Sequence, residues 1–187
     1  MSLETSKCYI RRYAQGHLQK LKGVGYDIGG GADGLRLPQT EVKLWDKKNG
    51  NGDAQILEGL ENDSLDFLYS SHCLEHMKKP VEALNRWIEV VKSGGYIYIA
   101  VPDYDLYEGG KGIRNGFHKC AFTLDKKTDM KVPLYNIYDF LFNHVKYDFI
   151  IEYVALCDEN YDYEVLEFED QTRKQAVCHI EFMLKKR

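Results

Sequence analysis

The stretch VGYDIGGGADG, residues 24–34, decides the fold. Its first five residues are a mostly apolar run of strand character, and a G-x-G-x-x-G pattern follows from Gly29 to Gly34. Glycines at this spacing allow a tight turn and let the backbone approach a bound ligand closely. Together they predict the first strand of an open α/β sheet, with a ligand at its carboxyl end.

Outward from this stretch, short apolar runs alternate with amphipathic segments, which is typical of a doubly wound, Rossmann-like sheet. The first crossover helix must be short because Pro38 interrupts it, and any strand at Asp53–Leu57 is vestigial. The last two strands are expected to be antiparallel because only a loop joins them. Strands are expected at Val24–Ile28, Val42–Asp46, Leu65–Tyr69, Tyr96–Val101, Phe149–Leu156 and Gln175–Leu184, and helices at Pro80–Lys92 and Leu134–His144.

Length and composition narrow the protein's class. A chain of 187 residues predicts one domain, 1–187, and its net charge of −4 disfavours nucleic acid as a partner. Five widely spaced cysteines without a C-x-x-C pair disfavour disulfides and structural zinc, and no apolar run reaches the ~20 residues that span a bilayer. We expect a cytoplasmic protein without a membrane partner; the sequence leaves the oligomeric state open.

Two acidic residues distinguish between the classes of ligand that can bind at a glycine-rich turn. Asp27 precedes the first glycine by two residues, where its charge would repel the pyrophosphate of a dinucleotide and attract a ligand that carries an ammonium group. Asp46, at the end of the second strand, is placed to accept hydrogen bonds from ribose hydroxyls. Asp53 is a candidate acceptor for an adenine amino group, although a lone acid after glycine is more often a turn residue.

Several motifs, read in order, carry a family resemblance. They are GYDIGGG (25–31), GDAQ (52–55), DSLDFLYSSHCLEH (63–76), PVEALNRW (80–87) and VKSGGYIYIAVPD (91–103). Together they resemble the class I S-adenosylmethionine-dependent methyltransferases. The likeness is greatest to the UbiE-like superfamily, including bacterial members found with surface-polysaccharide biosynthesis.

This resemblance implies S-adenosylmethionine as cofactor and a sheet of six to seven strands in the order 3-2-1-4-5-7-6. Strand 7 is antiparallel, and strand 3 is short or missing here. The chain departs from the family at Asp33, where a third glycine is usual, and in its abridged crossovers. The implied cofactor-binding residues are Asp27, Gly29, Gly30, Gly31, Asp46, Asp53, Ala54, Ser70 and Ser71.

Residues 103–133 lack sustained periodicity and are expected to cover the substrate site. Within them, His118 resembles a His-Lys pattern of polysaccharide-associated relatives and is the preferred catalytic base, since a histidine accepts a proton near neutrality. Asp103 is the alternative base or the partner that orients His118, and His72 has a comparable chance of touching the ligand. Loop acids including Asp105 offer oxygen ligands for Mg²⁺, but such acids are usually solvated, so no metal is expected.

The leading interpretation is a methyltransferase that acts on a small-molecule or glycan-linked (saccharide) acceptor, with oxygen favoured because a histidine base is available. The alternatives are a binding module that holds S-adenosylmethionine without turnover, favoured by Asp33, and an NAD-dependent oxidoreductase, which Asp27 opposes.

Overall fold

The expected first strand is present as β1, Val24–Ile28, inside a six-stranded sheet of order β2-β1-β3-β4-β8-β7. The computed structural model describes residues 3–47, 50–165 and 169–187. Neighbours from β2 to β4 are parallel, whereas β8 is antiparallel to both β4 and β7. This is the expected order without its third strand, because the chain turns at 53–57 and forms no strand there. The other strands of this sheet are β2 (Glu41–Trp45), β3 (Leu65–Ser71), β4 (Val91–Pro102), β7 (Phe149–Cys157) and β8 (His179–Lys186).

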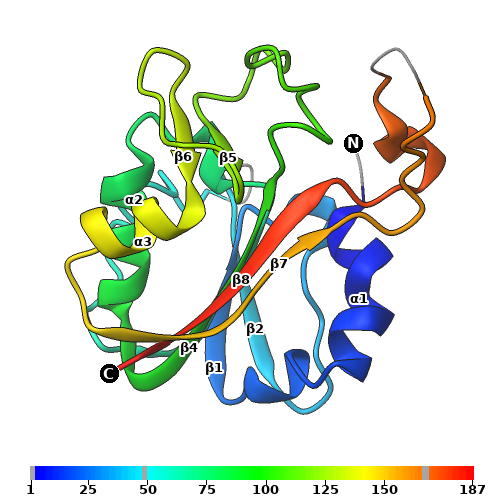
Figure 1. The fold of residues 1–187 in the computed structure, drawn as a ribbon. Helices are drawn as coiled ribbons and strands as arrows, with labels where there is room; N and C mark the ends of the chain where they lie inside the picture. Colours follow the sequence, from blue (N-terminus) through cyan, green and yellow to red (C-terminus); the bar gives the residue numbers. More distant parts are fainter. Residues whose placement is uncertain (1–2, 48–49, 166–168) are drawn as a thin grey trace.

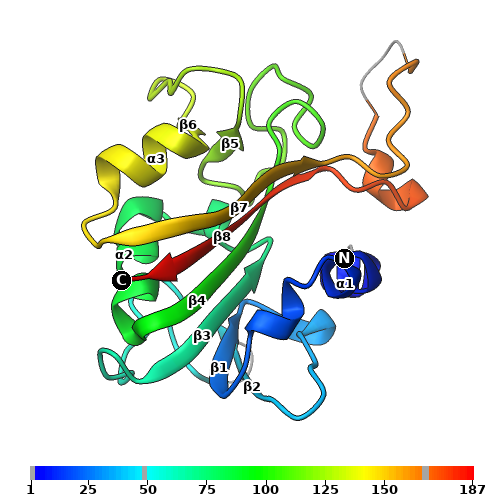
Figure 2. The same cartoon turned by 60° about the horizontal axis from the view of Figure 1, so that its bottom comes forward.

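Helices cover both faces of the sheet (Figures 1 and 2). The helix α1, Glu4–Ala14, lies on one face, and α2, Pro80–Val90, and α3, Ile137–His144, lie on the other. Side chains alternate along the central strands accordingly, because successive strand residues point to opposite faces. Phe67, Tyr69 and Tyr98 belong to the core on the α1 side, and Leu68, Ile97 and Ile99 belong to the larger core on the α2 side.

Several expected elements differ from the observed ones. The helix predicted to Lys92 ends at Val90, because β4 already begins at Val91 and not at Tyr96. The crossover after β1 contains only a 3₁₀ turn, Gly31–Asp33. The segment predicted as a helix from Leu134 begins as strand β6, Leu134–Asn136, because the Asn136 side chain accepts hydrogen bonds from the first amide groups of α3 and starts that helix. The last strand begins at His179, because Gln175 has a left-handed φ of 71° that ends a preceding 3₁₀ turn.

Sequence patterning did not predict α1, and its burial shows why. The buried side chains of this helix include Glu4, Cys8 and Arg12, spaced four residues apart. They form a stripe that faces the sheet, but the stripe is largely polar, so a search for apolar periodicity passes over it. The helix is held to the sheet mainly through charged groups.

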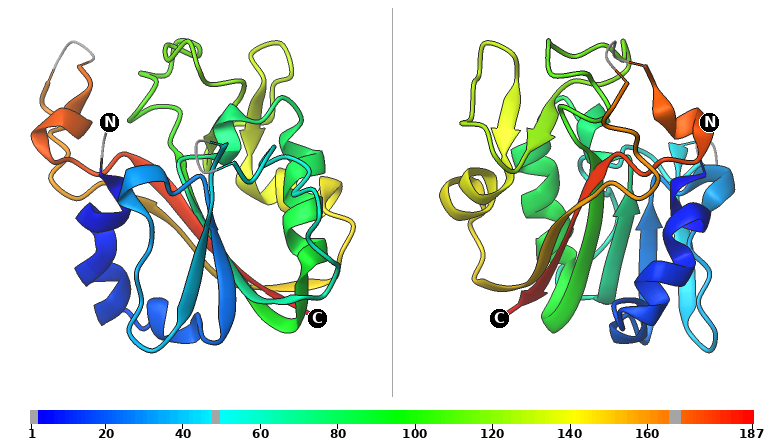
Figure 3. Two further views of the ribbon diagram at one scale, coloured as in Figure 1. Left: turned by 180° about the vertical axis from the view of Figure 1, so that it is seen from behind. Right: turned by 45° about the vertical axis from the view of Figure 1, so that its right-hand side comes forward.

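The loops that follow β1, β3 and β4 gather at one edge of the sheet (Figures 1 and 3). Residues 103–133 lie there with a small parallel sheet of β5, Ala121–Thr123, and β6. Ligands of open α/β sheets bind at this edge, outside the carboxyl ends of the strands. None of the helices in the described ranges is long and apolar enough to cross a membrane.

Asp33 joins the glycine-rich turn to the start of α1. Its Oδ2 accepts hydrogen bonds from the backbone N–H groups of Thr5 and Ser6 at 2.8 and 3.2 Å, and the Ser6 hydroxyl donates to its Oδ1. The helix has no side-chain cap of its own, so a carboxylate from another segment satisfies the unpaired amides at its N-terminus. The residue that departs from the family pattern therefore anchors a helix.

Replacing Asp33 with Ala should lower the free energy of unfolding by about 0.5–2 kcal/mol, the usual cost of removing a helix cap. Denaturant unfolding followed by circular dichroism measures the loss. Asp53→Ala, at an exposed turn acid that contacts no helix N-terminus, is the matched control, and equal losses in the two variants would contradict the capping role.

Candidate functional site

The glycine turn after β1 is held by close packing against two neighbouring segments. Gly29 has a left-handed φ of 80°, and its N–H donates to the Trp45 carbonyl at 2.8 Å. A Cβ on Gly29 would lie 2.6 Å from Cys73 Sγ, and a Cβ on Gly30 would lie 2.3 Å from Asp27 Oδ2. Side chains are therefore excluded at both positions, and the turn brings the ends of β1, β2 and β3 together.

Asp27 is fully buried beneath this turn. Its Oδ2 accepts the backbone N–H of Leu35 at 2.6 Å, while Oδ1 accepts no hydrogen bond from the described residues. Burial raises the pKa of Asp27 to about 7, and the nearby carboxylates of Asp33 and Asp46 contribute to the rise. One oxygen thus fixes the loop, and the other is buried without a hydrogen-bond partner among the described residues.

Asp46 lies directly after β2, and its contact with a ribose stays a prediction. The structure gives local roles to the next two predicted residues. Asp46 Oδ2 lies 3.6 Å from the position of a Cβ on Gly31, so this carboxylate faces the glycine turn. Asp53 is exposed, and its Oδ1 accepts the N–H of Gln55 at 2.8 Å within its own turn. The Ala54 carbonyl accepts Trp87 Nε1 at 2.7 Å and packs the turn against α2. Contact of Asp53 and Ala54 with a cofactor stays a prediction.

The two predicted serines lie at the end of β3 beside the glycine turn. The buried Ser70 hydroxyl donates to the carbonyl of Ile28 at 3.0 Å and ties β3 to β1. The Ser71 hydroxyl is buried without a hydrogen-bond partner among the described residues. Ser70 thus ties two strands together, the Ser71 hydroxyl is buried, and contact of either serine with a cofactor stays a prediction.

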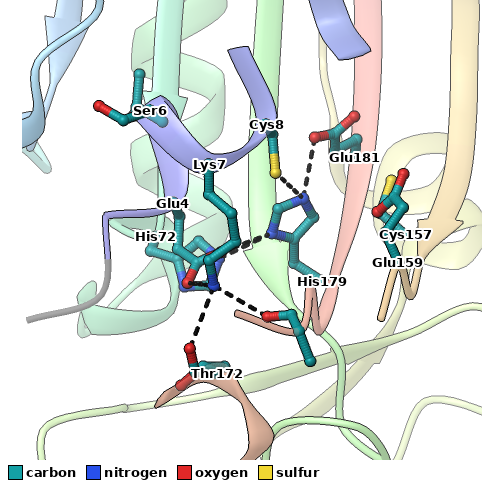
Figure 4. Close-up of polar contacts among 12 residues, drawn as sticks. Glu4, Ser6, Lys7, Cys8, His72, Cys157, Glu159, Thr172, His179 and Glu181 are labelled. Carbon is teal, nitrogen blue, oxygen red and sulfur yellow. Dashed lines mark hydrogen bonds and ion pairs between the residues drawn. The ribbon is translucent and has the colours of Figure 1, made fainter. Parts of the chain in front are cut away.

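His72 connects this edge to a buried group of charges (Figure 4). Its Nε2 lies 3.2 Å from His179 Nδ1, and its backbone has a left-handed φ of 55°. Burial and the neighbouring His179 lower the pKa of His72 to about 3, so its ring is neutral and accepts the proton of His179. Such a weak base is poorly suited to remove a proton near neutrality, and contact of His72 with a ligand stays a prediction.

Glu181 of β8 lies at the centre of these charges. Its carboxylate accepts hydrogen bonds from Arg11 at 2.7 and 2.8 Å, Arg12 at 2.7 Å, Tyr98 at 2.6 Å and His179 at 2.9 Å. Burial alone would raise the pKa of Glu181, but these cations hold it well below its usual value. Burial likewise opposes the charge on His179, but hydrogen bonds that include Glu181 raise its pKa well above the usual value. Sequence reasoning missed this group because its members lie on α1, which was not predicted, and on β4 and β8.

His118 sits in the expected long connection, but it is buried and not a solvated loop residue. Its Nδ1 donates to Glu108 Oε1 at 2.5 Å, and its Nε2 accepts Asn115 Nδ2 at 3.1 Å. The ring stacks on Tyr107 with centroids 5.4 Å apart and meets the edge of His76 at 4.8 Å. Burial alone would raise the pKa of Glu108, but the hydrogen bond from His118 and two from backbone amides hold it below its usual value, so Glu108 is an ionised carboxylate that fixes the imidazole tautomer.

Glu75 lies under this histidine pair. It belongs to a 3₁₀ turn, Leu74–His76, and is 1% exposed. Neither carboxylate oxygen accepts a hydrogen bond within the described chain, yet Oε1 is 3.6 Å from His76 Nε2 and 3.8 Å from His118 Nε2. Burial raises the pKa of Glu75 to about 8. The motif LEH follows β3, so the sequence puts Glu75 at the edge of the sheet where the strands end. Only the tertiary structure shows that it is buried beside two imidazoles.

Asp103 has a different role from the one expected as the partner of His118. Its Oδ1 accepts the N–H groups of Asp105 and Leu106, both at 3.0 Å, and so fixes the start of the long connection. Burial raises the pKa of Asp103 to about 6. Glu108 orients His118 instead, because the chain turns back through residues 104–118 and brings that acid beside the ring. Asp103 as an alternative base stays a prediction.

An open cavity of about 370 Å³ adjoins the His118–Glu108 pair. Its lining includes hydrogen-bonding groups of both charges, as expected of a site for a polar molecule. The lining residues are Tyr107, Glu108, Arg114, Asn115 and Asp170.

Comparisons with known proteins agree with the fold. A family described as a methyltransferase domain matches residues 34–99, and no curated protein matches the chain. The fold is that of a SAM-dependent methyltransferase from Archaeoglobus fulgidus, with 20% identity, 99% and 95% of the two chains covered and a TM-score of 0.59. An S-adenosylmethionine-dependent methyltransferase from Mesorhizobium loti has 14% identity, 99% and 100% coverage and a TM-score of 0.58. Phosphoethanolamine N-methyltransferase 2 of Haemonchus contortus, solved with S-adenosyl-L-methionine, has 13% identity, 98% and 56% coverage and a TM-score of 0.56.

The raised pKa of Asp27 gives a signed prediction for stability without ligand. The unfolded chain ionises Asp27 near 3.8 and the folded chain near 7, so its penalty on folding is absent below pH 4 and grows up to about pH 7. The free energy of unfolding of the wild type, compared with that of Asp27→Asn, should therefore fall as the pH rises from 4 to 7, by at most ~1.4 kcal/mol per pH unit. Denaturant unfolding of both proteins from pH 4 to 8 measures the difference. If the difference does not change with pH, the Asp27 carboxylate is not buried in the way that the structure shows.

Proposed function

We propose that this protein is a class I, S-adenosylmethionine-dependent methyltransferase that acts on a small-molecule or glycan-linked acceptor, at oxygen. The observation that carries the proposal is the buried carboxylate of Asp27, whose Oδ1 accepts no hydrogen bond from the described residues, beneath a glycine turn that also faces Asp46. The fold and the methyltransferase-domain match over residues 34–99 support it.

The charge of the glycine turn favours this cofactor over a dinucleotide. S-adenosylmethionine carries an ammonium group and a sulfonium, and both are attracted by a carboxylate at the position of Asp27. The pyrophosphate of NAD would meet the same carboxylate and also Asp46 across the turn. Asp46 accepts the ribose hydroxyls in this proposal, and Ser71 offers its buried hydroxyl on the methionine side.

Acceptor activation is assigned to His118. Methyl transfer from a sulfonium is an in-line displacement, so the protein aligns the two reactants and assists removal of the acceptor's proton. The Nε2 atom of His118 presents a lone pair, because Glu108 fixes the proton on Nδ1. Residues 103–133 cover the acceptor, and the cavity beside Glu108 receives it.

Finer assignments rest on the sequence. The motifs from 25 to 103 support a UbiE-like enzyme, and the His-Lys pattern at His118 supports an acceptor of the surface-polysaccharide class. We also propose a single domain over 1–187 and a cytoplasmic location. A binding module without turnover loses its main support because Asp33, the residue that favoured it, caps α1 and leaves the glycine turn intact.

S-adenosylhomocysteine should raise the thermal midpoint and NAD should not, because a ligand that binds only the folded state stabilises it by mass action.

Asp46→Ala should weaken binding by roughly 1.5–3 kcal/mol, since ribose hydroxyls lose charge-assisted acceptors. Thermal unfolding and calorimetry measure the two effects, with Glu82→Ala, at an exposed acid on α2, as the control. Stabilisation by NAD alone would end the proposal.

His118→Ala should lower turnover by ~10²–10⁴-fold while leaving cofactor affinity unchanged, because activation of the acceptor is lost and the cofactor is held by other strands. Turnover is measured as methyl transfer to the acceptor, once identified, and affinity by calorimetry. Asp103→Asn keeps an oxygen acceptor for the loop amides and should change turnover little. Full activity of His118→Ala from pH 6 to 9 would return the role to Asp103 or His72.

A further inference from the structure

We propose that Glu75, His76 and His118 bind one divalent metal ion of the zinc class, through a carboxylate oxygen and two imidazole Nε2 atoms. Metal binding depends on these side chains alone. The role of the ion in catalysis rests on the proposed function.

The three ligand atoms have the separation that such an ion requires. Glu75 Oε1 lies 3.6 Å from His76 Nε2 and 3.8 Å from His118 Nε2, and all three atoms lie within 4.8 Å of one another. Ligands of tetrahedral zinc, at 2.0–2.2 Å from the metal, are about 3.4 Å apart. Small side-chain rotations therefore close the site.

The surroundings of the Glu75 carboxylate favour a bound cation. It is 1% exposed, and neither oxygen receives a hydrogen bond from the residues that the structure describes. A buried carboxyl group without a hydrogen-bond partner is costly, and buried acidic groups are normally paired or bound to metal. No lysine or arginine forms an ion pair with Glu75 among the described residues, and the ion-pair partners of its carboxylate within 4 Å there are the two imidazoles.

Both histidines are held in the tautomer that a metal needs. The Nδ1 of His118 donates to Glu108 Oε1 at 2.5 Å, and the Nδ1 of His76 donates to the carbonyl of Phe117 at 3.2 Å. Metal-binding histidines almost always donate their second ring N–H to a carboxylate or carbonyl in this way, which directs the other nitrogen to the ion. The Asn115 amide now donates to His118 Nε2 at 3.1 Å, and it moves aside when the metal binds.

Two histidines and one carboxylate leave a fourth position for a substrate atom. Glu108 and Asn115, which both contact His118, line the open cavity described above. A bound zinc-class ion lowers the pKa of an oxygen ligand strongly, so an acceptor hydroxyl in that position loses its proton to solvent near neutral pH. The oxygen then attacks the methyl group of the sulfonium, the carbon–sulfur bond breaks with its electron pair going to sulfur, and neutral S-adenosylhomocysteine leaves. His118 thereby activates the acceptor as a metal ligand.

The full chain is stripped with a chelator, and Zn²⁺ and Co²⁺ are added as probes. We expect one zinc per chain by calorimetry and elemental analysis, and a visible Co²⁺ spectrum of a four- or five-coordinate site. Glu75→Gln and His76→Ala should abolish this binding, and Glu108→Gln, which alters only the support of His118, should weaken it ~10–100-fold. His144→Ala, an exposed histidine on α3, should bind as the wild type does.

His76 is 39% exposed, so His76→Ala keeps the fold and tests the site even if Glu75→Gln is unstable. No zinc bound by the wild type, or equal binding by all the variants, overturns the proposal. The thermal shift with S-adenosylhomocysteine is measured on the metal-free chain in parallel. If S-adenosylhomocysteine stabilises the metal-free chain but zinc does not bind, the metal site is refuted and the proposed methyltransferase function stands. If zinc binds but S-adenosylhomocysteine does not stabilise the chain, the metal site stands and the proposed function is refuted.

Discussion

The hydrogen bonds to the buried carboxylate of Glu181 are the interaction on which the site-bearing edge depends. Arg11 and Arg12 of α1 reach this one acid on β8, so a helix with few apolar contacts is fixed to the sheet by charge. Breaking such a buried pair by removing one partner typically costs about 3–5 kcal/mol, because the other charge stays behind. The same acid keeps His179 protonated and thereby holds His72 at the end of β3.

With α1 fixed, the glycine turn is held from both sides. Asp33 accepts the N-terminal amides of α1, and Asp27 accepts the N–H of Leu35 from beneath. The turn therefore keeps its conformation without the fuller helix that usually follows it. Preorganisation of this kind lowers the entropy that a ligand must remove on binding. It also explains how an abridged crossover and an acid in place of glycine are compatible with a cofactor site.

The second half of the site comes from a long connection that folds back over the sheet edge. Asp103 fixes its first turn, and Glu108 meets His118 ten residues further on. This return buries His118 above Glu75, so a short 3₁₀ turn and a long loop place four titratable side chains together. The backbone of the connection is anchored to the LEH turn, since the N–H of Lys119 donates to the Glu75 carbonyl at 2.7 Å.

The sequence by itself determined the alternation of strands and helices, because apolar periodicity and glycine spacing act over a few residues, and the family resemblance of its motifs supplied the strand order. It also placed Asp27, Asp46 and the loop serines at strand ends, which parallel pairing brings together. It did not reveal α1, whose buried stripe is polar, nor the partner of His118, which was expected at Asp103 and is Glu108. Those depend on which distant charges meet inside the protein, and Glu75 shows the reason: the chemistry of a carboxylate follows from its burial and its neighbours, which only the tertiary structure decides.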